Sequence, residues 1–481
     1  MRHTVAISDI HLSEVERTSG LWMRYRQEKY APGPAIAEMV AKLLARIAEG
    51  DELALVLNGD IFDFDAPRVV AGESMFHDQP RDAVHAAPMI EAILRDHGAF
   101  VGALASVLAK GHEICFVSGN HDVQLTLPEV RAVVAARLVD AVRAIAPDMS
   151  EASVRARVHF RAWFYLTRDG ILFEHGNQYD SYCSFRYPMA PFGKKPAEIQ
   201  PTMGSLATRN LVSRMGYFNP HVDDSYMLGV VGYLHHWAKY YLFSRRSLAF
   251  AWAVGAFRTL RELTVRRDPS SKSRRRANVT AAALENGVPL RHVARHARLF
   301  ARPAEDELGK VARELWVDRV LLGGFTLALA ALWALLTHGA WRSGALAVPG
   351  LMLFYELFVP KGSLEETWKK VDRYARRVGA VHRARAVVFG HTHKATGAWE
   401  NGVFYGNTGS WSAAYLDLEC TRLATEARPL VWLKSGVDGR PELLGGLVTY
   451  RDGTFIEPPA DAESSGQFLG QLAPAGPAAE S

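Results

Sequence analysis

Two histidines separated by one residue stand in the stretch AVVFGHTHKATG, residues 386–397, directly after a run typical of a β-strand. Imidazole nitrogens at alternate positions of a glycine-flanked loop could bind metal ions. The pair by itself is weak evidence, because short histidine pairs also occur in polar turns that follow strands. A metal-binding role therefore depends on the other side chains that the fold brings to the same point.

Four further polar clusters follow β-type runs elsewhere in the chain. They are Asp9-Ile10-His11, Gly59-Asp60-Ile61-Phe62-Asp63, Gly119-Asn120-His121-Asp122 and Glu174-His175-Gly176. Their carboxylate, amide and imidazole groups suit Mn²⁺, Fe or Zn²⁺. Any one cluster could be a capped turn, because Asp and Asn favour turns. Five at successive strand ends favour a metal centre, and their glycines let the backbone approach an ion closely.

The segments that would position these clusters alternate between strand and helix. Residues 3–9, 52–60 and 112–120 are predicted strands, whereas residues 34–50 and 99–110 are predicted helices. This alternation predicts an α/β fold, with the ligand site beyond the carboxyl ends of the strands. Each predicted strand ends in one of the polar clusters.

In order along the chain, the five clusters resemble the motifs of the calcineurin-like metallophosphoesterases, which are DxH, GDxxD, GNH(D/E), H and GHxH. The resemblance covers residues 1–180 and 385–415. It implies a four-layer α/β/β/α sandwich, assembled from both ends of the chain around a long, mainly helical insert. The expected parts are a first core segment (1–180), an insert or lid (181–380), a second core segment (381–456) and a disordered tail (457–481).

The resemblance also implies roles for individual side chains. Two ions would have seven ligands: Asp9, His11 and His393 on one, Asn120, His175 and His391 on the other, and Asp60 bridging both. His121 would be the catalytic residue that contacts the substrate phosphate and protonates the leaving oxygen. Asn120 would lie beside it at the substrate, and Asp122 would orient its imidazole. Asp63 would either support this arrangement or cap a helix.

Such a centre would hydrolyse a phosphate ester or a pyrophosphate bond. Two divalent ions about 4 Å apart can activate a water molecule and neutralise the phosphoryl oxygens during in-line attack. Mn²⁺ is the expected ion, and Fe and Zn²⁺ are the alternatives. The chain is therefore predicted to be a metal-dependent phosphatase or a related hydrolase. A non-catalytic scaffold is the alternative from another class, but such proteins usually lose metal ligands, whereas every ligand position here is filled.

Two apolar segments within the insert, residues 320–337 and 345–360, could form a hairpin over 320–360. Both core segments must lie on one side of any membrane to build one site, so the number of crossings would be even. Arg319 and Lys361 flank the pair, which places both ends in the cytoplasm by the positive-inside rule. We therefore expect membrane insertion or interfacial docking on the cytoplasmic side, for example of a bacterial inner membrane. The alternative is a helical pair buried in the lid of a cytoplasmic protein.

The composition is that of a globular protein, with 481 residues, 48% hydrophobic residues and a net charge of +5. The charge does not by itself imply a nucleic-acid partner, because the excess is concentrated locally. The aromatic residues of the insert also lie mostly in apolar runs rather than at stacking positions. A nuclease or cyclic-nucleotide phosphodiesterase is the alternative enzyme, and it would need a basic groove with exposed aromatics. Three widely separated cysteines predict a reducing compartment. The first residues show no pattern of a cleavable signal peptide.

Within the superfamily, the chain is most similar in style to bacterial UDP-2,3-diacylglucosamine pyrophosphohydrolase-like enzymes. The similar stretches are SDIHL (8–12), GDIFDF (59–64) and GNTGSW (406–411). Two departures are His121, where that group usually has arginine, and a much longer insert. The expected substrate is a phosphorylated small molecule that is lipid-linked or nucleotide-linked. The sequence does not indicate an oligomeric state.

Overall fold

The computed structural model is a mixed α/β protein. It describes residues 1–71, 73–76, 80–188, 198–216, 219, 221, 235, 237–242, 248–265, 272–336, 350–351, 354–355, 357, 364–436 and 442–457. The expected disordered tail therefore falls almost wholly outside the described residues, as do residues 337–349 of the predicted hairpin.

Seven strands form the larger sheet, in the order β14-β13-β12-β1-β2-β5-β6. Their bounds are Arg2–Ile7 (β1), Glu52–Asn58 (β2), Glu113–Val117 (β5), Val158–Arg161 (β6), Arg428–Ser435 (β12), Leu443–Arg451 (β13) and Thr454–Ile456 (β14). β1, β2, β5 and β6 run parallel, and β12 pairs with β1 antiparallel. The three predicted strands are thus confirmed. Each ends two or three residues earlier than predicted, so the polar clusters lie in the loops that follow.

Five strands form the second sheet, in the order β10-β11-β9-β8-β7. Their bounds are Phe164–Leu166 (β7), Ile171–Glu174 (β8), Ala386–Phe389 (β9), Thr396–Glu400 (β10) and Val403–Asn407 (β11). β8 and β9 run parallel, with Ile171 opposite Ala386. The loops that carry His175 and the histidine pair therefore leave the sheet at the same edge.

The two sheets pack face to face, and one apolar cluster takes side chains from both. Ala6, Val56 and Val117 contribute from the larger sheet, and Phe173 and Val388 contribute from the second sheet. These residues alternate with others that point to the opposite faces, as the two-residue period of a strand requires. The strands are therefore buried on both sides, which explains their nearly continuous apolar sequences.

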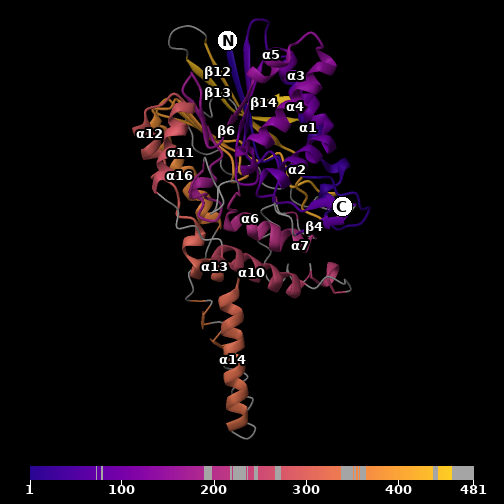
Figure 1. The fold of residues 1–481 in the computed structure, drawn as a ribbon, viewed down its shortest axis with the longest axis vertical. Coiled ribbons are helices and arrows are strands. Elements are labelled where there is room, and N and C mark those ends of the chain that lie inside the picture. The colour runs from indigo at the N-terminus through magenta and orange to yellow at the C-terminus, as the bar shows by residue number, and fades with distance from the viewer. Residues whose placement is uncertain are drawn as a thin grey trace, which may run out of the picture.

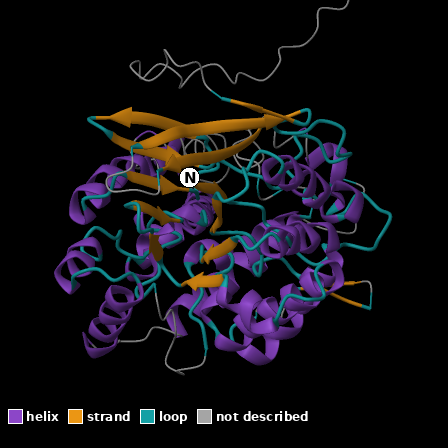
Figure 2. Cartoon of the chain, turned by 90° about the horizontal axis from the view of Figure 1, so that it is seen from above, coloured by secondary structure: helices purple, strands orange, loops and turns teal. Residues whose placement is uncertain are grey.

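Helices cover the two outer faces of this pair of sheets, as Figures 1 and 2 show. The larger sheet is covered by α1 (Gly33–Leu44), α2 (Ala83–Asp96), α3 (Gly98–Ala109) and α4 (Pro128–Ile145), and the second sheet by α11 (Lys272–Glu285), α12 (Leu290–His296) and α16 (Leu364–His382). The helix predicted over 34–50 ends earlier, at Leu44. The amides of Arg46 and Ile47 then donate to the carbonyl oxygens three residues before them, those of Leu43 and Leu44, and these bonds form tighter turns that end the helix.

Other parts of the insert pack near the loops at the carboxyl ends of the strands. Helices α6 (Met203–Ala207), α7 (Ser213–Met215), α10 (Leu248–Val265) and α13 (Leu308–Glu314), with the π-helix η5 (Thr208–Val212), lie below the sheets in Figure 1. Most of them share an apolar cluster that includes Leu206, Leu263 and Val311. Arg209 of η5 is fully buried, and its guanidinium donates to the carbonyl oxygens of Met75 (3.0 Å) and Phe76 (3.2 Å). The insert is thus bound tightly to the core.

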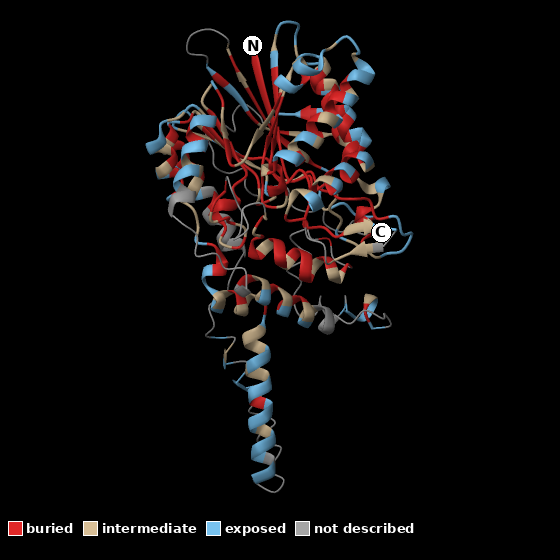
Figure 3. Ribbon diagram, viewed as in Figure 1, coloured by how far each residue is buried: buried red, intermediate tan, exposed pale blue. Residues whose placement is uncertain are grey.

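Helix α14 (Val317–Leu336) projects away from the rest of the molecule (Figures 1 and 3). Most of its apolar side chains are exposed, including Leu321 (68%), Phe325 (60%) and Leu335 (75%), whereas the face that carries Thr326 is covered. Within the described ranges, no single helix is long and apolar enough to cross a membrane. Two bent helix pairs meet the criterion together, Ala83–Asp96 with Gly98–Ala109 and Leu308–Glu314 with Val317–Trp333.

Candidate metal centre

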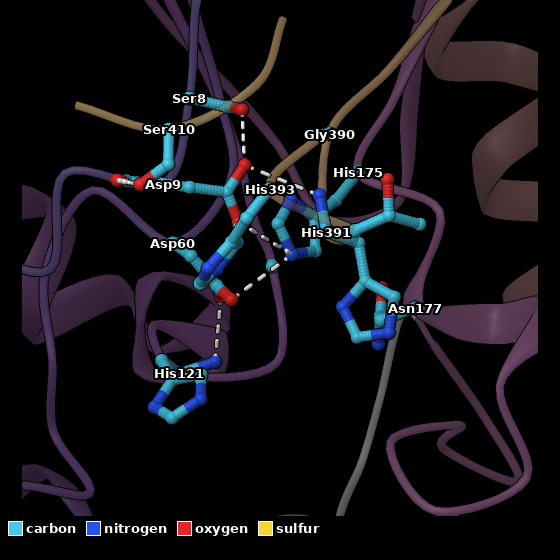
Figure 4. A network of polar contacts seen from close by, with 12 residues as sticks. Ser8, Asp9, Asp60, His121, His175, Asn177, Gly390, His391, His393 and Ser410 are labelled. Atoms are coloured by element: carbon cyan, nitrogen blue, oxygen red, sulfur yellow. Dashed lines mark hydrogen bonds and ion pairs between the residues drawn. The ribbon is translucent and has the colours of Figure 1, made fainter. Parts of the chain in front are cut away.

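The loops after β1, β2, β5, β8 and β9 meet at one edge of the two sheets. Backbone hydrogen bonds connect these loops to one another: Asp9 N–H donates to the Gly59 carbonyl (3.0 Å), and Gly390 N–H donates to the His175 carbonyl (2.9 Å). The five polar clusters of the sequence are consequently brought together at one place, although they span almost 400 residues of chain. Figure 4 shows the side chains of Asp9, Asp60, His175 and His393 pointing toward one another.

Several groups of three side chains could hold an ion, and two of them contain predicted ligands only. In the first, Nε2 of His393 lies 3.2 Å from Oδ1 of Asp9 and 3.3 Å from Nε2 of His11. In the second, Asp60, His175 and His391 place their ligand atoms within 4.8 Å of one another. Nε2 of His175 lies 3.0 Å from Oδ2 of Asp60. The two groups correspond to the division of ligands that the motif resemblance implies.

Two buried oxygen atoms in this cluster support the presence of a cation. Oδ1 of Asn120 has no hydrogen-bond partner among the residues that the structure describes, and Oδ1 of Asp9 accepts no hydrogen bond there and has the imidazole of His393 beside it. A buried polar atom without a partner costs free energy, and each such atom in a native protein calls for an explanation. Carboxylate and amide oxygens surrounded by imidazoles suit a divalent cation, so the residues present fit the predicted metal centre.

Three of the predicted ligands are held by one atom while another atom faces the centre. Asp9 accepts hydrogen bonds at Oδ2 from the hydroxyl of Ser8 and from the amide of His391 (3.1 Å), so its Oδ1 points inward. Asp60 accepts at Oδ1 from the amide of His121 (2.7 Å). Nδ1 of His175 lies 3.0 Å from the carbonyl oxygen of Asn58. Contacts of this kind fix the orientation of metal ligands and the tautomer of a histidine.

The backbone at the ligands is strained in a consistent way. Asp9, His11, Asp60, His391 and His393 all have positive φ angles, between 51° and 69°. Residues with a Cβ atom avoid this left-handed region, at a cost of about 1 kcal/mol or more each. The surrounding strands and loop contacts impose this conformation, which turns the five side chains toward one point.

Two glycines permit the close approach of neighbouring loops. A Cβ atom added to Gly119 would lie 2.2 Å from Oδ1 of Asp60, and one added to Gly390 would lie 2.7 Å from Oδ2 of Asp9. No side chain fits at either position without displacing a predicted ligand. The close contacts of this fold therefore explain why the GNH and GHxH motifs have glycine at these positions.

The charges of the cluster favour the forms that bind metal. Burial lowers the pKa of His11, and the neighbouring imidazoles lower it further, so His11 is neutral near pH 7. Burial by itself raises the pKa of Asp60, but His175 and His121 hold it below the ordinary value. Asp60 is therefore ionised, as a bridging ligand has to be.

His121 lies beside this cluster and contacts two carboxylates. Its Nδ1 is 3.1 Å from Oδ1 of Asp63 and 3.3 Å from Oδ2 of Asp65. Burial lowers the pKa of His121, but the carboxylates of Asp60, Asp63 and Asp65 together raise it well above the ordinary value. A raised pKa favours the protonated imidazole, which is the form that can donate a proton.

The carboxylate of Asp63 orients His121. The resemblance had implied that Asp122 would do so. Asp122 instead accepts from the amides of Gly119 (2.6 Å) and Ile61 (2.8 Å), so it connects two of the ligand loops. Burial and, next, the charge of Asp60 raise the pKa of Asp122 to about 7. Asp63 also accepts from the amide of Asp65 (2.9 Å), which means that it stabilises its own turn as well.

Besides Asp65, which contacts His121, two site residues were not expected from the sequence. Oδ2 of Asp180 lies 3.2 Å from Nε2 of His391, so this carboxylate holds a predicted ligand. His221, from the insert, contacts Asp63 and stacks on His11. Asp180 follows His175 by five residues, and its nearness to the clusters was a weak signal. His221 stands in no motif, and the sequence around it offers no signal.

The comparisons with known proteins add no relative. No family model matches the chain, and no curated protein matches it. The family that the motifs indicate therefore stays a prediction.

Proposed function

We propose that this chain is a dinuclear, metal-dependent phosphoesterase that hydrolyses a phosphate ester or a pyrophosphate bond. One observation carries the proposal: six of the predicted ligands, from loops that follow four strands, have ligand atoms close enough together to hold metal ions, and the loop after a fifth strand carries Asn120 beside them. We further propose that the two sheets and their covering helices are the four-layer α/β/β/α sandwich of the calcineurin-like metallophosphoesterases.

The protein's own groups have distinct roles in this proposal. Two divalent ions bound there, Mn²⁺ in the first instance, would polarise the phosphoryl group and supply an activated water. Asp60 provides the negative charge between the two ligand groups. His121 donates its proton to the leaving oxygen, and Asp63 holds the imidazole so that Nε2 faces away from the carboxylates.

The substrate would carry its phosphate close to a lipid surface. Helix α14 contains 20 residues, and most of its apolar side chains are exposed, so they could enter the surface of a bilayer. At its base, the guanidinium of Arg319 lies 5.6 Å from the ring of Trp316 and 6.0 Å from that of Tyr355. Aromatic and basic residues are enriched at this depth of a membrane interface. We propose that the segment 320–360 contacts the cytoplasmic side of a membrane.

A single substitution tests the catalytic proposal. Asp60→Asn keeps the size of the side chain but removes its charge, and should lower hydrolysis of bis-p-nitrophenyl phosphate or a UDP-linked lipid by about 10³-fold or more. The Mn²⁺-loaded wild type and variant would be compared in detergent, with bound Mn²⁺ measured in each. Asp140→Asn, which alters an exposed carboxylate on α4, is the matched control and should keep full activity. Undiminished hydrolysis by Asp60→Asn would contradict the proposal.

A further inference from the structure

His221 belongs to the insert, yet its side chain lies buried at the metal centre. Its ring stacks on that of His11, with the ring centroids 3.8 Å apart and the planes at 21°. Its Nε2 lies 3.3 Å from Oδ2 of Asp63. The insert thus contributes a side chain to a site that is otherwise formed by the two core segments.

Contacts to the core hold His221 in this position. Its amide donates to Oδ1 of Asn219 (3.0 Å), and Nδ2 of Asn219 donates to the carbonyl oxygen of Ala413 (2.8 Å). Ala413 lies in the loop after β11. In the same loop, the amide of Trp411 and the hydroxyl of Ser410 both donate to the carbonyl oxygen of Asp9. The segment that carries His221 is therefore attached to the loop that also holds a predicted metal ligand.

Asp63 connects His221 to His121. One carboxylate oxygen of Asp63 faces Nδ1 of His121 at 3.1 Å, and the other faces Nε2 of His221 at 3.3 Å. A carboxylate held at both oxygens has little freedom to rotate. The ring of His121 is also packed against those of His11 and His221, with centroids 4.8 and 6.0 Å apart. The orientation of the proton donor therefore depends on a residue of the insert.

A role for His221 as a metal ligand is less consistent with this geometry. Its ligand atom lies within 4.8 Å of those of His11 and Asp63, so the three could in principle hold an ion. An imidazole, however, binds a metal in its own ring plane. Two stacked and nearly parallel rings cannot both direct a nitrogen lone pair at the same ion.

We propose that His221 is a positioning residue of the active site, through which the docked insert fixes Asp63 and thereby the imidazole of His121. The inference rests on the proposed function. It means that the insert contributes to the position of the proton donor rather than to metal binding.

The test uses the full-length Mn²⁺-loaded protein and four variants, with bis-p-nitrophenyl phosphate as the substrate. His221→Ala should lower kcat by about 10- to 100-fold, because a misplaced catalytic group loses about that much. KM and the content of bound Mn²⁺ should stay within about twofold of wild type. His221→Gln, which keeps an N–H donor for Asp63, should recover part of kcat. Added imidazole should restore part of the activity of His221→Ala.

Two further variants separate positioning from folding. Asn219→Ala leaves His221 in place but removes its attachment to Ala413, and should lower kcat by a smaller factor. His235→Ala, which changes an exposed histidine of the same insert, should have wild-type kinetics. A wild-type kcat in His221→Ala, loss of bound Mn²⁺, or an activity that imidazole does not restore would each overturn the inference. If the wild type itself cleaves no ester, the proposed function fails, and this inference fails with it.

Discussion

Replacing Gly119 by alanine should disable the metal centre through one steric clash. Gly119 precedes the predicted ligand Asn120, and its backbone lies outside the left-handed region, so alanine meets no conformational penalty there. The added Cβ would nevertheless lie 2.2 Å from Oδ1 and 2.6 Å from the amide nitrogen of Asp60. Because the backbone of Asp60 is also too close, rotation of its side chain cannot relieve the clash.

The size of the effect follows from these distances. Cβ atoms essentially never lie closer than 3.0 Å to another heavy atom, so the Asp60 carboxylate has to move by about 0.8 Å. A displacement of about 1 Å in a catalytic arrangement can cost 10²-fold in rate. Inserting a methyl group into a well-packed interior costs about 1–3 kcal/mol of stability. We therefore expect kcat/KM to fall about 100-fold and the protein to stay folded.

The assay is hydrolysis of bis-p-nitrophenyl phosphate by Mn²⁺-loaded protein, together with urea unfolding. Gly102→Ala is the control, because Gly102 lies exposed on α3 with no atom within 4 Å of the added Cβ. This change should leave kcat/KM unaltered and raise the stability by about 1 kcal/mol, since alanine favours helix. A Gly119→Ala enzyme that binds two Mn²⁺ ions and keeps the wild-type kcat/KM would refute the reasoning.

Two further predictions concern stability and the membrane. Burial raises the pKa of Glu305 to about 7 from an ordinary 4.5, so its contribution to stability falls as the pH rises through that interval. The free energy of unfolding of the wild type, measured in urea, should be roughly 3 kcal/mol lower at pH 8 than at pH 5, and that of Glu305→Gln should not show this fall. An identical pH dependence in both proteins would contradict this. The double substitution Leu321→Glu and Phe325→Glu on α14 should prevent co-sedimentation with vesicles of anionic phospholipid. Leu284→Glu, an equally exposed change on α11, should have no such effect; co-sedimentation of all three proteins would argue against α14 as the contact.

The position of the site could be predicted because its residues follow strands directly. Asp9, Asp60 and Asn120 each come one to three residues after an apolar run, and the carboxyl ends of parallel strands meet at one edge of a sheet. The pair His391 and His393 also follows a strand. Local patterns were therefore sufficient for the ligand loops, for three strands of the larger sheet and for helix α3.

The partners of these residues could not be predicted, because they come from distant parts of the chain. His121 and Asp122 are adjacent in sequence, but the contact that orients His121 comes from Asp63, 58 positions away. Asp180 and Asp122 have equally polar surroundings in the sequence. Which histidine or amide each one contacts depends on how the loops cross in space.

The sequence by itself determined which residue types stand at the ends of the strands, because strand periodicity and glycine positions are local properties. The tertiary structure decided how those residues point. It places five predicted ligands in the left-handed backbone region, presses Gly119 against Asp60, and brings His221 of the insert onto His11. Such contacts depend on two sheets packing face to face and on an insert docking at their edge, and no local pattern records either.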